Sequence, residues 1–167
     1  MKSGVSRHTR IVLYFAAGVV AGFLIISSLT TVELQRTACF GICPVYTLRV
    51  WGIGLVTYHG EFGLVKGDRI SCISTVEAWR LIGAALSHGL IRFDTTYTNG
   101  NPDEEGNRTC LSFGPFTKCV LVAFRPTASA QPATLIILNQ LIDQVTNSVQ
   151  WTGTIEQIRD QYIRPKP

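Results

Sequence analysis

The N-terminal part of the chain contains one long apolar run, from Ile11 to Leu29, without a charged residue. At the helical rise of 1.5 Å per residue, roughly 19 residues extend for about 28 Å, close to the hydrocarbon thickness of a bilayer. The basic residues Lys2, Arg7 and Arg10 precede the run, and Glu33 is the first charge after it. Because basic residues favour the cytoplasmic side, we expect a transmembrane helix through residues 11–29, with the rest of the chain exported.

A cleaved secretory signal peptide has the same order of a basic stretch and an apolar stretch. The apolar run here is longer than in most signal peptides, and the segment from Ser27 to Thr31 offers small residues without a clear A-x-A cleavage site. Residues 1–30 are therefore expected to be a membrane anchor or a signal segment, and their length favours the anchor.

Alternation of apolar and polar positions predicts β-strands beyond this segment. The run from Val45 to Trp51 would place Tyr46, Leu48 and Val50 on one face. Gly52-Ile53-Gly54 then separates it from a second β-rich run at residues 55–59, which indicates a hairpin. Further strands are predicted at residues 62–65, 69–73, 108–113 and 116–124, the last two joined at Gly114-Pro115.

Two helices are predicted between and after these strands. Ser74 and Glu77 have the spacing of a capping box, so a helix should begin there and end near Gly89. A second helix is expected to have Pro132 in its first turn. The apolar positions expected to face the core are Val76, Trp79, Ile82, Gly83 and Leu86 in the first helix, and Leu135, Leu138, Ile142, Val145 and Val149 in the second, with Trp151 following.

Residues 98–107, with three consecutive acids at 103–105, read as a polar loop. The order of strands, helix, strands and helix predicts an α+β domain, with a mainly antiparallel sheet covered by two helices. We expect this single exported domain to cover residues 31–152 and to be followed by a C-terminal tail at residues 153–167.

The net charge of +4 comes largely from the basic residues before the apolar run, so it indicates membrane orientation and not the binding of an acidic partner. Three of the fifteen basic residues precede the apolar run, which leaves twelve against all eleven acids in the rest of the chain. Because these basic residues are scattered among acids, we expect no nucleic-acid partner.

Five cysteines in an exported domain predict disulfides with one thiol left over. Cys39 and Cys43 flank Gly41 and are spaced for a short disulfide loop, although a redox-active pair and a pair of metal ligands remain alternatives. The redox motif C-x-x-C, the nucleophile motif G-x-S-x-G and a phosphate loop are all absent from the sequence. We therefore assign no catalytic, cofactor-binding or metal-binding residues and no cofactor.

The same segment carries a resemblance to a known family. Its motif residues are Thr37, Cys39, Phe40, Gly41, Cys43, Pro44 and Tyr46. This T-x-C-F-G-x-C-P-x-Y pattern resembles the opening segment of the bacterial domain of unknown function 6438 family, and the likeness extends over roughly residues 33 to 150. Members often have G-D-G in the first hairpin, where this chain has Gly52-Ile53-Gly54.

The resemblance implies a bacterial protein and brings no established reaction, substrate or cofactor, while the expected transmembrane helix and export point to the cell envelope. The anchored form would lie in the bacterial inner membrane with its domain facing the periplasm, whereas the cleaved form would be secreted. Our first hypothesis is a non-enzymatic domain that binds an envelope protein or another envelope component. The alternative is a thiol-disulfide redox or thiol-sensing protein that uses Cys39 and Cys43.

The turn at Gly114-Pro115 generates a prediction about Cys110 and Cys119. Counting outward from a two-residue loop places these cysteines opposite each other in a non-hydrogen-bonded pair, whose Cα atoms approach to about 4.5 Å. A disulfide accepts that distance. With Cys39 joined to Cys43, Cys72 would be the free thiol, and the alternative is that Cys110 and Cys119 are ordinary buried thiols.

Peptide mapping without reductant, on protein from an oxidising compartment, should recover Cys110 and Cys119 in one bridged pair of peptides. Separate alkylation of the two thiols, or a bridge from either to another cysteine, would contradict both the pairing and the hairpin register.

Overall fold

The computed structural model describes residues 7–99, 106–124 and 132–162 of the chain. The strands are β1 (Thr30–Arg36), β2 (Val45–Trp51), β3 (Leu55–Phe62), β4 (Gly67–Cys72), β5 (Thr96–Asn99), β6 (Asn107–Phe113) and β7 (Phe116–Phe124). The helices are α1 (Arg7–Leu29), α2 (Thr75–Ser87), α3 (Ala133–Thr146), α4 (Val149–Thr152) and α5 (Ile155–Tyr162), with a 3-10 turn, η1, at Leu90–Arg92.

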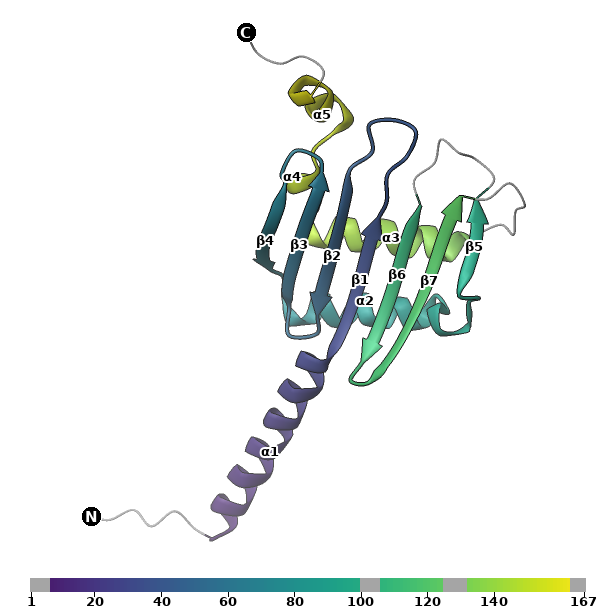
Figure 1. The fold of residues 1–167 in the computed structure, drawn as a ribbon. Helices are drawn as coiled ribbons and strands as arrows, with labels where there is room; N and C mark the ends of the chain where they lie inside the picture. The colour runs from purple at the N-terminus through teal and green to yellow at the C-terminus, as the bar shows by residue number, and fades with distance from the viewer. Residues whose placement is uncertain (1–6, 100–105, 125–131, 163–167) are drawn as a thin grey trace.

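The strands form one sheet in the order β4-β3-β2-β1-β6-β7-β5, and α2 and α3 lie across one of its faces (Figure 1). Every neighbouring pair is antiparallel except β5 and β7, which are parallel. The predicted α+β class, with a mainly antiparallel sheet covered by two helices, is confirmed.

The predictions missed two strands and misplaced one. β1 and β5 were not predicted, although Thr30, Val32 and Leu34 alternate correctly and are buried on one face of β1. The predicted strand at residues 62–65 is wrong, because β3 ends at Phe62 and the backbone N–H groups of residues 64 and 65 donate to α4. Of the predicted polar loop, residues 98 and 99 belong to β5, and residues 100–105 lie outside the described part.

The buried face of α2 differs from the predicted one. Ile82 is buried as expected, but its neighbours in the core are Ala78, Leu81 and Ala85. The predicted core positions Val76, Gly83 and Leu86 are exposed, and Trp79 is only partly buried. The small alanines let the helix approach the sheet closely, so the helix packs through this face and leaves Val76 and Leu86 outside.

Helix α3 matches the prediction up to its last turn. Leu135, Leu138 and Ile142 are buried in the core, as expected. The helix ends at Thr146, because Asn147 adopts a left-handed conformation with φ of 51°. Val149 therefore lies in the separate helix α4 and is exposed.

Helix α1 enters the sheet without a linker, since β1 begins at the residue that follows it. Backbone hydrogen bonds from Gly52 N to Thr30 O and from Gly114 N to Leu29 O, both 2.9 Å, hold the junction between the β2–β3 and β6–β7 turns. The stretch Arg10–Leu29 is long and apolar enough to cross a membrane, a form shared by membrane anchors and signal sequences. The direction of α1 is thus fixed relative to the sheet.

Part of the expected C-terminal tail is ordered against the domain. Helix α5 buries Ile158, and the ring of Tyr162 lies 4.8 Å from that of Phe62. The Tyr162 hydroxyl also donates to Gly63 O at 3.1 Å. Residues 155–162 therefore cover the end of β3.

The capping box of α2 is confirmed. Ser74 Oγ accepts from Glu77 N at 3.1 Å, and Glu77 Oε2 accepts from Ser74 N at 3.0 Å. Ser74 Oγ also donates to Glu77 Oε2 at 2.7 Å. This bond, and then the bond from the Ser74 backbone N–H, lower the pKa of Glu77. The box satisfies backbone N–H groups that the first turn of a helix leaves without partners.

Ser74→Ala should lower the free energy of unfolding by about 1 kcal/mol at neutral pH, the usual cost of losing an N-cap side chain. Because the pKa of Glu77 is lowered on folding, its contribution is complete above the unfolded pKa and is lost as the pH falls through the folded pKa. The difference between wild type and variant should therefore shrink in acid. Thermal or denaturant melts in detergent measure it, and Thr75→Ala, one residue inside the helix, is the matched control. Equal losses for the two variants would contradict this N-cap.

Candidate functional site

The segment from Thr37 to Tyr46 contains the connection between β1 and β2 and the first two residues of β2, at the end of the sheet opposite α1 (Figure 1). β1 starts directly after α1 and has seven residues, so its rise carries the chain about 23 Å from the helix. The motif residues thus gather at the tip of the domain farthest from α1.

Beneath this segment lies a polar group that we call the Asp143 cluster, formed by Arg36, Tyr46, Asp143 and Ser148. Asp143 Oδ2 accepts from Arg36 Nη2 at 2.6 Å and from Arg36 Nε at 3.2 Å. Its other oxygen, Oδ1, accepts from the Tyr46 hydroxyl at 2.6 Å and from Ser148 Oγ at 2.8 Å. The cluster therefore ties the end of β1 and the start of β2 to the last turn of α3.

The Tyr46 side chain forms the buried part of this cluster. Burial, and to a smaller extent the Asp143 carboxylate, raise its pKa well above the usual value for a phenol, against the opposing effect of Arg36. The hydroxyl is consequently protonated at physiological pH and acts as a donor to Asp143. Its ring belongs to a row of three aromatic rings. The ring centroids of Tyr46 and Tyr58 are 5.6 Å apart, and those of Tyr58 and Trp151 are 5.1 Å apart.

The hydrogen bonding of the cluster indicates a structural role. Both oxygens of Asp143 accept two bonds each, which uses the acceptor positions that a carboxylate offers. The side chains of Arg36 and Asp143 are only 15% and 22% exposed. A carboxylate held in this way positions its neighbours, and none of its acceptor positions is left to take a proton from a substrate.

Residues 39–43 form a small loop at the tip, which we call the Cys39 loop. The structure places the sulfur atoms of Cys39 and Cys43 at disulfide distance, with Cα atoms 5.7 Å apart. Thr37 anchors the strand that enters the loop, because its N–H and hydroxyl both donate to Gly106 O, at 2.9 and 3.1 Å. Phe40 projects from the loop with 86% of its surface exposed.

An open pocket of about 420 Å³ lies beside the Cys39 loop. The motif supplies Cys43, Pro44 and Tyr46 to its wall, and the remaining wall combines the Asp143 cluster with two isoleucines, Ile42 and Ile155. The surface beside the Cys39 loop is therefore partly apolar and partly charged.

The other predicted disulfide residues lie elsewhere. Cys110 and Cys119 face each other across β6 and β7 in the predicted register, with sulfur atoms at disulfide distance and Cα atoms 4.1 Å apart. The turn between them has Gly114 at φ of 54°, as a primed turn requires. Cys72 is an exposed free cysteine at the end of β4. Within the described ranges, no three His, Cys, Asp or Glu side chains gather as metal ligands would.

The sequence predicted the motif residues but not the polar cluster that holds the motif segment in place. Arg36, Asp143 and Ser148 were not among the predicted site residues, and Arg36 and Asp143 lie 107 positions apart. One signal was available, because Asp143 is the only acidic residue between Glu105 and Glu156 and the only charged residue of α3. Such an isolated acid in a core-packing helix generally needs a partner.

Asp143→Ala should lower the free energy of unfolding by about 2 kcal/mol, because it leaves a largely buried guanidinium and a buried phenol without their common acceptor. Amide hydrogen exchange should also quicken in residues 36–46. The matched control is Arg49→Gln, which breaks the Arg49–Glu33 ion pair on the open face of the sheet and should cost less than about 1 kcal/mol. Equal costs for the two variants would show that the cluster does not support the tip.

Comparison with known proteins places the chain in a family. No curated protein matches its sequence. The profile of the family described as Domain of unknown function (DUF6438) matches residues 30–146, which are well over half of the chain and include the motif segment, both disulfide-distance pairs and Asp143. The chain therefore belongs to the DUF6438 family.

Proposed function

We propose that this protein is a membrane-anchored, non-enzymatic binding module of the bacterial envelope. In this proposal α1 holds the domain at the inner membrane, and the Cys39 loop presents Phe40 to a protein partner in the periplasm. The observation that carries the proposal is the exposure of Phe40 on a loop that is closed by a cysteine pair and supported by the Asp143 cluster.

An aromatic side chain that is 86% exposed loses the stabilisation that burial in the protein's own core would bring. A flexible loop would also lose conformational entropy when it bound a partner. The cross-link between Cys39 and Cys43 restricts the loop before binding, so less entropy remains to be lost. This combination of a rigid backbone and an exposed aromatic anchor is typical of binding hot spots.

The neighbouring surface suggests the chemistry of the partner. Ile42, Pro44 and Ile155 give the pocket beside the Cys39 loop an apolar part, and the charged pair of the Asp143 cluster also lines it. A protein surface with an apolar recess for Phe40 and polar groups around it fits this arrangement. The position of the loop, about 23 Å beyond the end of α1, keeps it clear of the membrane.

The redox alternative has less support from the surroundings of the cysteines. A reactive thiol needs a nearby cation or a helix N-terminus to lower its pKa. Arg36 lines the same pocket as Cys43, but its guanidinium is engaged with Asp143. Among the described helices, none begins in residues 39–43. A measured reduction potential within the range of cellular thiol partners would favour the redox function over the binding function.

A photoreactive amino acid at position 40 tests the binding function in cells that produce the full chain. The matched control is position 70, because Ile70 is also strongly exposed, at 73%, but lies on the edge strand β4. We expect a defined protein adduct from position 40 that position 70 does not give. With the partner purified, Phe40→Ala should weaken binding about 30-fold, a loss of about 2 kcal/mol that is typical of a hot spot. No adduct from position 40, or the same adducts from both positions, would exclude this function.

A further inference from the structure

Helix α2 has a second apolar face, which we call the outer arc: Val76, Trp79, Gly83 and Leu86. At about 100° per residue, these four positions fall within about 80° of the helix circumference. Val76 is 62% exposed, and Gly83 and Leu86 are exposed as well. The core-facing residues of α2 occupy a different arc, and of the outer arc only Trp79 packs partly against the rest of the protein.

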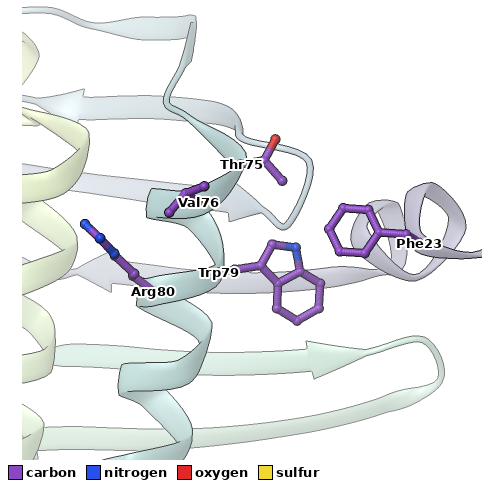
Figure 2. Close-up of a pocket in the computed structure, with 5 residues that line it drawn as sticks. All are labelled: Phe23, Thr75, Val76, Trp79 and Arg80. Carbon is purple, nitrogen blue, oxygen red and sulfur yellow. The ribbon is translucent and has the colours of Figure 1, made fainter. Parts of the chain in front are cut away.

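The outer arc lies on the side of α2 that faces α1. Helix α2 crosses the end of the sheet nearest α1, and α3 covers the far end (Figure 1). The Trp79 side chain points toward Phe23 at the end of α1, whereas Arg80 points away from α1 (Figure 2). The rings of Phe23 and Trp79 lie 5.9 Å apart, and Trp79 Nε1 donates to Ser27 Oγ at 3.2 Å.

Two turns add exposed apolar side chains at the same end of the domain. Phe116 follows the β6–β7 turn, where Gly114 N donates to Leu29 O. Ile53 lies in the β2–β3 turn and is 40% exposed, and its carbonyl accepts from Thr75 Oγ1 at the start of α2. Three separate elements thus place apolar groups around the point where α1 enters the domain.

We propose that this base, made of the outer arc with Ile53 and Phe116, rests in the headgroup region of the bilayer that α1 spans. The proposal depends on the membrane-spanning part of the proposed function. Because no linker separates α1 from β1, the base stays beside the surface of that bilayer. Tryptophan favours the membrane–water interface, and a helix with an apolar face beside polar residues is suited to lie along it.

Contact at the base would fix the tilt of the domain as well as its distance from the membrane. Helix α1 alone permits rotation about its own axis and tilting within the bilayer. A second contact through α2 restricts both motions. The Cys39 loop at the opposite end then points away from the lipid surface.

Spin labels on the full-length chain in liposomes test the proposal. The background is Cys72→Ser, and labelling without reductant leaves the other cysteine pairs intact. Gly83→Cys is the main site, because a Cβ atom at Gly83 meets no atom within 4 Å and the label should not disturb packing. Phe15→Cys in α1 provides the lipid reference, Glu61→Cys on β3 the water reference, and Arg80→Cys a control on α2 itself.

We expect collisions of the Gly83 label with a water-soluble nickel chelate to be several-fold fewer than those of the Glu61 label, and collisions with oxygen to be more frequent. The Arg80 label should lie closer to the water reference. If Gly83 matches Glu61 while Phe15 is in lipid, the base does not touch the membrane and the anchor remains. If Phe15 itself is accessible to the chelate, the anchor fails, and the proposed base contact fails with it.

Discussion

The pairing of β1 between β2 and β6 is the constraint on which both ends of this domain depend. β1 lies in the middle of the sheet order, and every one of its residues is paired with β6 and most with β2. Its first residue follows α1 directly, and its last residue is Arg36 of the Asp143 cluster. One fully paired strand therefore fixes the direction of the N-terminal helix at one end and the base of the Cys39 loop at the other.

The Asp143 cluster extends this constraint to α3. Arg36 and Tyr46 end and begin neighbouring strands, and Asp143 reaches both of them from the last turn of α3. A charge pair with so little exposed surface adds little net stability compared with apolar packing, but loss of one partner is costly. The main effect of the cluster is therefore on position, because it holds the two ends of the motif segment at a fixed separation. The cysteine pair then closes the loop between these two ends.

Local rules predicted much of the fold from the sequence. The capping box at Ser74, the alternation of Tyr46, Leu48 and Val50, and the register of Cys110 against Cys119 all depend on residues within about ten positions of each other. The failures have nonlocal causes. β5 is a strand only because it pairs in parallel with β7, and the contact from Arg36 to Asp143 joins residues that no local pattern connects. Domain class follows from periodicity, whereas the support of the site follows from tertiary packing.

The incorrect prediction for α2 has a more specific cause. Apolar periodicity identifies which side chains avoid water, but it does not say whether they meet the protein core or another apolar phase. Most soluble helices have one such face. In α2, Ala78, Leu81 and Ala85 face the sheet while Val76 and Leu86 face outward on the side of α1, so two apolar arcs share one helix. Because both arcs are apolar, periodicity alone assigns the residues of the outer arc to the core as readily as those that pack on the sheet.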